Sequence, residues 1–410
     1  MNDYIIIGNG VAAVGCIEGI RSADTSGSIT VISKEPHPVY CRPLISYYLE
    51  GKTDLARIPY RDGDFYEKNG CRVLYGKSAA KIDPANRTVT LDDGSVLPYS
   101  SVCLAAGSAP FVPPIRGLDT VPDAFTFMTL DDALALEQAT QTPKRVLIVG
   151  AGLIGLKCAE GLHGRAASVT VCDLADHVLP SILDADSASV LQSHLEQNGI
   201  RFMLSDTAER FDGRTAHMRS GVTVGFDVLV LAVGVRANTA LAKACGCDTN
   251  RGVLVGCGME TTVPDVYAAG DCTEGTDASC GQKRVLAILP NAYMQGRTAG
   301  VNMAGGTAVL DNAIPMNAIG FFGLHTMTAG TYAGEVYEEK TETSRKKLYT
   351  QDDLLKGFIL IGDTTRAGLY TSLIRNRTPL SEIDFEQMKK IATSASFSSK
   401  TRTKIFGGVV

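Results

Sequence analysis

The chain has 410 residues, more than one hydrophobic core usually serves, so two or three domains are expected. Its 44 acidic and 39 basic residues give a formal net charge of −5, which excludes the basic surface that nucleic acids or anionic lipids require. No apolar run reaches the ~18 residues of a membrane helix, and the first residues lead into a strand without the features of a leader. We therefore expect a cytoplasmic protein with neither nucleic acid nor membrane as a partner.

The 11 cysteines include no Cys-x-x-Cys pair, which argues against a thioredoxin-type dithiol and against iron–sulfur ligands in this chain. Cys245, Cys247 and Cys257 come close together in the sequence, but they lack the usual zinc spacing and a histidine partner. We expect no metal site. Unpaired thiols fit a reducing compartment.

The N-terminal segment is predicted to be a buried strand that runs into a Gly-x-Gly-x-x-Ala turn and then an apolar helix. Gly8 permits the tight turn, Gly10 lets the backbone approach a pyrophosphate, and Ala13 lets helix and strand pack closely. The helix N-terminus turns partial positive charge toward the phosphates. A second strand over 28–33 follows, and Glu35 just past its end is placed to accept hydrogen bonds from a ribose.

The same pattern returns in the second quarter of the chain, where a strand enters a helix through Gly150, Gly152 and Gly155. Its second strand, over 168–172, is followed by Asp173, about 20 residues after the glycines, as a ribose-binding carboxylate requires. One glycine-rich turn is weak evidence because such turns often serve packing alone. Two of them, each with strand, helix, strand and terminal acid in order, predict two dinucleotide sites.

Three further segments indicate that one of these sites holds a flavin. Two apolar strands end in small-residue turns, one at Gly107 and the other at Gly234. A third strand ends in Asp271, and an acid in that position can bind the ribityl chain of a flavin.

With these segments the chain resembles the FAD-dependent pyridine nucleotide–disulfide oxidoreductase superfamily over nearly its full length. The branch it resembles contains the rubredoxin and ferredoxin reductases and the flavin region of the NADH nitrite reductases. Residues 39–46 (VYCRPLIS) are similar to the loop beside the FAD in that branch, and 289–297 (LPNAYMQGR) to the turn and helix under the flavin pyrimidine. Residues 355–363 (LKGFILIGD) resemble the opening of its C-terminal interface domain.

The resemblance implies an α/β fold with two Rossmann-like domains of glutathione-reductase type and a small C-terminal α+β domain. We assign 1–112 and 243–320 to a split FAD domain and 113–242 to an NAD(H) domain. The interface domain is expected over 321–395, and a flexible tail over 396–410.

Short alternating segments after residue 316 predict an antiparallel sheet followed by two helices. The predicted strands are 318–322, 332–337, 345–350 and 355–361, and the predicted helices are 367–375 and 381–392, the second capped by Ser381.

The residues expected to contact the cofactors come from the two turns, the acids and the resembling loops. For FAD they are Gly8, Gly10, Ala12, Ala13, Glu35, Arg42, Pro43, Ala79, Ala106, Gly107, Asp271, Leu289, Pro290 and Asn291; for NAD(H) they are Gly150, Gly152, Leu153, Ile154, Gly155, Asp173 and Gly234.

The chain departs from the branch in three features. It often carries a basic residue shortly after the Pro-x-x-Ser loop, where this chain has Tyr47 and Tyr48, and an Arg where this chain has Met128. Arg42 is therefore expected to take more of the phosphate contact. Many relatives have Glu in the nucleotide helix where this chain has Lys157, which leaves the nicotinamide contacts open.

Cys41 and His325 are the two further candidates for chemistry. Relatives that oxidise NADH with oxygen or reduce coenzyme A disulfide keep a redox cysteine in this loop, but the register places it at Pro43 instead of Cys41. Beside a catalytic Cys41, a small residue next to the flavin remains an alternative. His325 either approaches the flavin or caps a strand, and its role stays open.

The leading hypothesis is an electron-transfer flavoprotein that links NAD(H) to a ferredoxin, a rubredoxin or an iron–sulfur subunit of a larger complex, as a homodimer or as part of a hetero-oligomer. The first alternative is an NADH oxidase or small-disulfide reductase that uses Cys41. The second is a flavin-bearing subunit without turnover of its own, against which the two intact nucleotide motifs argue.

Overall fold

The computed structural model describes residues 2–398, whose contacts group into two compact units. The first contains the described residues of Met1–Ala175, Gly199–Thr276 and Lys283–Asp311, and the second those of Asp176–Asn198, Asp277–Gln282 and Asn312–Val410. Both glycine turns belong to the first unit and the C-terminal sheet to the second. The finer domain bounds stay predictions.

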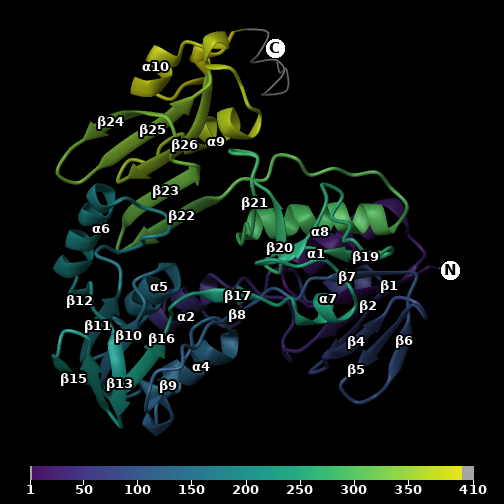
Figure 1. Cartoon of the computed structure of the whole chain (residues 1–410), viewed down its shortest axis with the longest axis horizontal. Helices are drawn as coiled ribbons and strands as arrows, with labels where there is room; N and C mark the ends of the chain where they lie inside the picture. Colours follow the sequence, from purple (N-terminus) through teal and green to yellow (C-terminus); the bar gives the residue numbers. More distant parts are fainter. Residues whose placement is uncertain (1, 399–410) are drawn as a thin grey trace. The chain divides into compact units, whose positions relative to one another are not determined.

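Two parallel five-stranded sheets form the frame of the first unit (Figure 1). The first has the order β19-β7-β1-β2-β3 and the second β12-β11-β10-β16-β9. Their strands are β1 (Asp3–Ile7), β2 (Ser28–Ser33), β3 (Cys71–Tyr75), β7 (Ser101–Leu104), β19 (Val266–Ala268), and β10 (Arg145–Val149), β11 (Ser168–Asp173), β12 (Ile200–Leu204), β16 (Val228–Leu231), β9 (Ala124–Phe125). In each sheet the strand before a glycine turn is central and pairs with the strand that leads to the expected ribose-binding acid. The α/β fold with two Rossmann-like sheets is confirmed.

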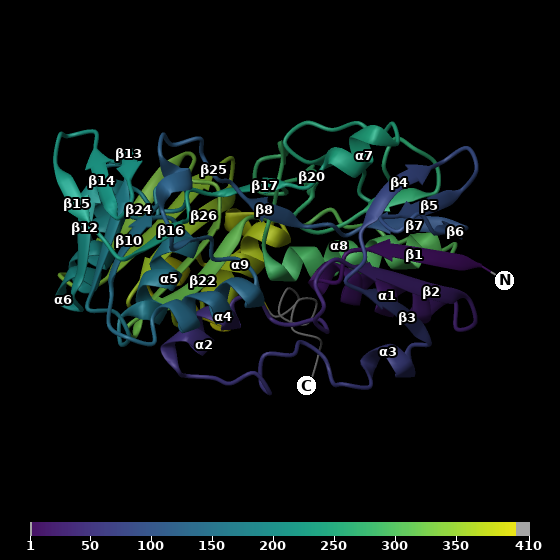
Figure 2. The ribbon, with the colours of Figure 1, turned by 90° about the horizontal axis from the view of Figure 1, so that it is seen from below.

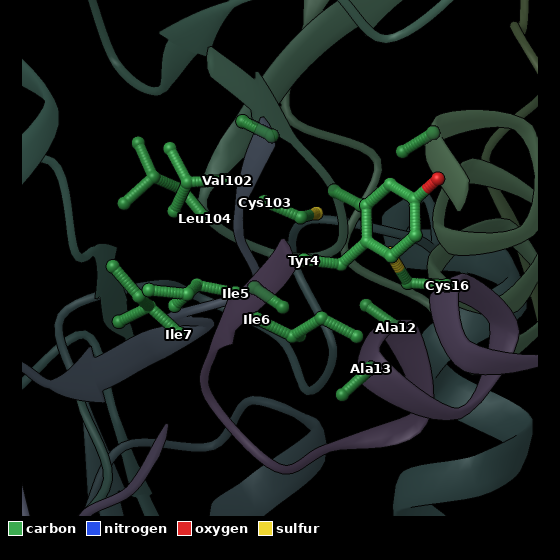
Figure 3. Close-up of a cluster of buried hydrophobic side chains, with 14 of the residues drawn as sticks. Tyr4, Ile5, Ile6, Ile7, Ala12, Ala13, Cys16, Val102, Cys103 and Leu104 are labelled. Carbon is green, nitrogen blue, oxygen red and sulfur yellow. The ribbon is translucent and has the colours of Figure 1, made fainter. Parts of the chain in front are cut away.

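The central strands are continuous apolar runs because both of their faces are covered. Figure 3 shows Tyr4 and Ile6 of β1 on the side of α1 (Val11–Ala23), whose Ala12 and Cys16 they approach, while Ile5 lies on the opposite face. All five side chains are at most 6% exposed. This core holds the strand before the first turn in a fixed place.

The other elements of the first unit surround the two parallel sheets or extend from them. Its remaining helices are α2 (Leu44–Glu50), α3 (Phe65–Lys68), η1 (Leu118–Thr120), α4 (Leu130–Ala139), α5 (Leu153–Leu162), α7 (Ala240–Ala244) and α8 (Leu289–Met303), and its remaining strands are β4 (Ala79–Asp83), β5 (Thr88–Leu91), β6 (Val96–Pro98), β8 (Ser108–Pro110), β13 (Ala208–Asp212), β14 (Thr215–Met218), β15 (Thr223–Gly225), β17 (Val235–Ala237), β18 (Val253–Leu254), β20 (Thr273–Thr276) and β21 (Lys283–Arg284). Figure 1 shows α1 and α8 on one side of the first sheet and β4–β6 on the other.

The chain passes from the first nucleotide-binding segment to the second and later returns, and these two connections lie side by side. β8 leaves the first segment and β17 returns to it, and the two strands pair antiparallel, with Val235 opposite Pro110. The Phe111 amide donates to the Gly234 carbonyl at 2.9 Å. Residues 111–234 therefore begin and end at one place.

Helices α1 and α8 pack backbone against backbone. A Cβ added at Gly296 would lie 1.9 Å from the Ala12 carbonyl oxygen, and one at Gly15 would lie 2.2 Å from the Tyr293 carbonyl oxygen. Gly19 and Gly300 meet the facing helix in the same way. Because these distances leave no room for a methyl group, glycine is required along both faces of the contact.

The second unit is built on an antiparallel sheet of the order β22-β23-β26-β25-β24. Its elements are β22 (Met316–Phe321), β23 (Leu324–Gly330), β24 (Glu335–Lys340), β25 (Arg345–Gln351), β26 (Leu354–Ile361), α6 (Ala185–Gln197), α9 (Ala367–Arg375), η2 (Leu380–Glu382), α10 (Phe385–Lys390) and η3 (Ser394–Ser396). The Lys347 ammonium lies 3.0 Å from the carboxylate of Asp184, which caps α6, and the Arg345 guanidinium lies 3.1 Å from that of Asp186. These ion pairs hold α6 to β25.

Several predictions for this unit were wrong in detail. Strand β23 was missed, and the strand predicted over 332–337 lies at 335–340. The predicted helix 381–392 is the shorter α10, because the Asp384 side chain, and not Ser381, accepts the capping bond from Gln387 N–H.

The segment predicted as a flexible tail starts with two buried residues. Ser396 and Phe397 are 3% and 2% exposed, so the predicted start at 396 falls in the core of this unit. The rest of that prediction, from 399 to 410, lies outside the described residues. Within residues 2–398, no helix combines the length and the apolarity needed to cross a bilayer.

Replacing Gly296 by Ala should lower the free energy of unfolding by roughly 2–3 kcal/mol, because the methyl group must push two helix backbones apart. Gly368→Ala is the matched control: this glycine also lies in a helix, and a Cβ there would meet nothing within 4 Å. The control should be neutral or stabilising by up to about 1 kcal/mol. Urea unfolding followed by circular dichroism measures both, and equal stability of the two variants would contradict the close contact.

Candidate functional site

The first glycine turn leaves the start of α1 open. Gly8 has φ 114°, and a Cβ on it would lie 2.0 Å from the Ala105 carbonyl oxygen, so no other residue fits the turn. Gly10 caps α1 without a side-chain hydrogen bond, and a Cβ there would meet nothing within 4 Å. The first N–H groups of a helix have no partner within the helix. A pyrophosphate can therefore approach this backbone closely.

The second turn repeats this construction. Gly150 has φ 117°, and a Cβ on it would lie 2.3 Å from the Ala232 carbonyl oxygen. A Cβ at Gly152 would meet nothing within 4 Å. A Cβ at Gly155 would lie 2.0 Å from the Gly150 carbonyl oxygen, so helix α5 and the turn pack closely. Leu153 at the start of α5 is 36% exposed. Gly150 and Gly152 thus have the same roles in the second turn as Gly8 and Gly10 in the first.

The acid at the end of each second strand is already hydrogen-bonded within the chain. Asp173 accepts from Ala151 N–H at 2.6 Å and from Ala175 N–H at 2.8 Å, which ties it to the second turn. A carboxylate has about four acceptor positions, so ribose hydroxyls can still bind it.

Glu35 is engaged by side chains instead of by the backbone. It accepts from the Tyr40 hydroxyl at 2.6 Å and forms an ion pair with Arg42. Arg42 also donates to the Met128 carbonyl at 3.0 Å. We expected Arg42 to contact phosphate. In the structure its side chain links Glu35 to Met128, the position at which the branch often has an arginine.

Asp271 and the start of α8 have the chemistry that a flavin dinucleotide needs. Among the described residues, no group donates a hydrogen bond to the Asp271 carboxylate, and burial raises the pKa of this carboxyl. A desolvated carboxylate without a donor suits the hydroxyls of a ribityl chain. Helix α8 starts at Leu289 with Pro290 in its first turn and no side-chain cap, so its dipole and backbone N–H groups are available to a ligand. These residues fit FAD.

The other predicted contact residues are distributed around these turns. Ala12 and Ala13 are buried in α1, Pro43 precedes α2, Ala79 begins β4, Ala106 and Gly107 follow β7, Gly234 precedes β17, Ile154 lies in α5, and Asn291 is buried in α8.

Helix α2, which follows the Arg42 loop, is fixed against α4 and α5 (Figure 2). The Leu49 carbonyl accepts from Arg165 at 2.6 Å, and the Tyr48 hydroxyl donates to Glu137. The Lys157 ammonium lies 4.7 Å from the centre of the Tyr47 ring and forms an ion pair with Glu160. Tyr47 and Lys157, which both depart from the branch, thus contact each other between the two nucleotide segments.

Sequence reasoning missed three polar residues that shape the first site. The Tyr66 hydroxyl donates to Asn9 at 2.6 Å and accepts from Val39 N–H at 3.2 Å, which connects the turn to the Arg42 loop. The Gln295 side chain, 2% exposed, accepts from Gly270 N–H at 2.8 Å. Gln295 could have been found as one of a row of polar residues at helical spacing in α8, with Asn291 and Thr298.

Cys41 is held by its backbone, which donates to Ile58 and accepts from Leu44, both at 2.9 Å. Burial raises the pKa of its thiol. His325 lies exposed within β23 and does not cap that strand. Within the described part of the chain, no three His, Cys, Asp or Glu side chains gather as a metal site.

A family model described as pyridine nucleotide-disulphide oxidoreductase matches residues 2–296. The chain is 34% identical over 395 residues to the NADH-dependent phenylglyoxylate dehydrogenase subunit epsilon of Aromatoleum evansii, which covers 93% of both chains. It is 31% identical to the NAD(P)H nitrite reductase of Bacillus subtilis over 98% of this chain and 50% of that protein, so it spans half of that relative. The fold matches a chain of the covalent putidaredoxin reductase–putidaredoxin complex with a TM-score of 0.88 and 21% identity, over 96% of this chain and 99% of that one.

We expect Asp173 to favour NADH over NADPH, because its carboxylate repels a 2′-phosphate. Asp173→Asn keeps an acceptor for Ala151 N–H but removes the charge, so the ratio of flavin reduction rates with NADH and NADPH should fall roughly tenfold, or about 1.4 kcal/mol. Asp227→Asn is the control, since Asp227 pairs with Arg145 at the start of β10, away from the turn. Anaerobic stopped-flow absorbance measures both ratios. A native protein that accepts NADPH as fast as NADH would contradict this role.

Proposed function

We infer the function of this chain from one premise: it belongs to the pyridine nucleotide-disulphide oxidoreductase family. It is an FAD-dependent NAD(H) oxidoreductase. We propose that it passes electrons between NAD(H) and a protein partner that carries an iron–sulfur cluster, either a small carrier such as a ferredoxin or rubredoxin or a subunit of a larger enzyme.

The observation that carries the proposal is the match over most of both chains to a protein named as a subunit. The match to the dehydrogenase subunit epsilon covers 93% of both chains, so this chain corresponds to most of that subunit. A subunit named in an NADH-dependent enzyme supports a role in which this chain handles the nicotinamide and another protein handles the final substrate.

In this proposal the residues of the first turn bind one cofactor and those of the second turn bind the other. Gly10 and the start of α1 bind the pyrophosphate of FAD, Asp271 accepts from its ribityl hydroxyls, and the first turn of α8 presents N–H groups where negative charge collects on reduction. Gly152 and Asp173 orient NAD(H). FAD, when bound, supplies hydride acceptance and the release of electrons one at a time. The protein then has to hold the nicotinamide in transfer geometry and to exclude water.

The alternative that uses Cys41 as a redox thiol is less well supported by the site. A thiol attacks as its thiolate, and burial raises the pKa of Cys41 instead of lowering it. The alternative of a flavin-bearing subunit without turnover conflicts with a second turn that is built as fully as the first.

Cys41→Ser should therefore leave NADH-driven reduction of one-electron dyes nearly unchanged. Cys71→Ser is the matched control, a second half-buried thiol whose pKa burial raises to about 11. Steady-state dye reduction measures both variants. A hundredfold loss for Cys41→Ser alone, about 2.7 kcal/mol, would move the function to the oxidase or disulfide reductase class.

The proposal is tested by mixing the NADH-reduced holoprotein, without oxygen, with ferredoxin, rubredoxin, oxygen or coenzyme A disulfide in a stopped-flow instrument. We expect an iron–sulfur carrier to reoxidise the flavin faster than oxygen or the disulfide. Asp173→Asn serves as a control, because it should slow reduction by NADH and leave reoxidation by the carrier unchanged. Turnover with oxygen or the disulfide, while both carriers are inert, would overturn the proposal.

A further inference from the structure

A pair of cysteines lies at the end of α7, in a part of the first unit that the proposed function does not use. Cys245 and Cys247 flank Gly246, and their sulfur atoms are 3.6 Å apart. A disulfide bond is about 2.05 Å long, so closing it requires the two sulfurs to approach by roughly 1.5 Å. Gly246, with φ 93°, forms the exposed turn between them. The backbone thus already directs both side chains to one place.

The two thiols differ in their access to solvent. Cys245 is half-buried, whereas Cys247 is 5% exposed and its sulfur lies 3.4 Å from the Thr261 hydroxyl. The Cys245 sulfur lies 3.2 Å from the Ala242 carbonyl oxygen, to which the protonated thiol can donate. A reagent from solution therefore meets Cys245 first and Cys247 second.

The two thiols also differ in ionisation, in the same order. The hydrogen bond from the Cys247 thiol lowers the pKa of Cys245 to about 7, and the same bond with burial raises the pKa of Cys247. Tyr99 faces the pair from the loop before β7; burial first, and the charge of Cys245 second, raise its pKa to about 12. The more accessible thiol is thus the better nucleophile near neutral pH.

We propose that Cys245 and Cys247 form a thiol–disulfide exchange site, which a low-molecular-weight disulfide such as oxidised glutathione converts to an intramolecular disulfide. The Cys245 thiolate attacks one sulfur of the reagent, and the first small thiol leaves with a proton from solution. Cys247 then loses its proton and attacks the Cys245 sulfur, which releases the second small thiol. The protein loses two electrons and two protons, and one disulfide becomes two thiols.

Other cysteines of the chain lack one of these features. Cys16 and Cys103 are fully buried in the core around β1, where a reagent cannot reach them (Figure 3). Cys257 and Cys280 are exposed, but neither has a second thiol within hydrogen-bond distance in the described structure. They are expected to stop at a mixed disulfide, so they serve as internal controls.

The test is a redox titration of the full-length holoprotein in glutathione buffers, followed by acid quenching, alkylation and mass spectrometry. Trypsin cleaves after Lys243 and Arg251, which isolates both cysteines and no others in the peptide ACGCDTNR. We expect this peptide to lose two hydrogen atoms and to become resistant to alkylation, with no stable glutathione adduct. Cys257 should carry the adduct instead.

Two variants separate the steps. Cys247→Ser should trap glutathione on Cys245, and Cys245→Ser should leave Cys247 reduced and slow to react. Cys257→Ser, the control, should leave oxidation of the pair unchanged. The proposal is overturned if the native peptide remains fully alkylatable under conditions that modify Cys257, or if glutathione remains on Cys245 in the native protein.

Discussion

The contact between α1 and α8 is the constraint on which the first nucleotide site depends. Four glycines let the two helices approach until backbone meets backbone, with room for no Cβ at Gly15 or Gly296. The N-terminus of α1 is the end that faces a pyrophosphate, and the N-terminus of α8 is the end expected under a flavin ring. Since the two helices cannot slide past each other, the distance between these two positive ends is fixed by the core and not by the ligand.

The two glycine turns have the same backbone conformation, but the acids beside them, Glu35 and Asp173, are held in different ways. Asp173 is held by amides of its own turn, so its position follows from the fold of one segment. Glu35 is held by Tyr40 and Arg42, and Arg42 in turn reaches the Met128 carbonyl in the other segment. The position of Glu35 therefore depends on the contact between the two nucleotide-binding segments, whereas the position of Asp173 does not.

The sequence allowed the glycine turns and the two parallel sheets to be predicted, because they depend on local backbone requirements and apolar periodicity. The start of α8 near Pro290 was expected from the resemblance of residues 289–297 to the reductase branch. The sequence could not reveal that Arg42 joins Glu35 to the Met128 carbonyl, or that Lys157 lies over Tyr47, because the contacts of Arg42 with Met128 and of Lys157 with Tyr47 join residues from separate segments. Strand β23 was missed because it mixes threonine and glycine with few large apolar residues. The start of α10 was misjudged because the N-cap is Asp384 and not Ser381.

The pairing of β8 with β17 bears on how such a chain can be recombined. Because residues 111–234 enter and leave at one place, a homologous segment could be spliced there without new linkers. However, this insert includes α6, whose Asp184 and Asp186 bind Lys347 and Arg345 far downstream in the gene. A chimera that changes nucleotide preference by exchanging this segment must therefore keep residues 184 and 186 complementary in charge to Lys347 and Arg345 of β25.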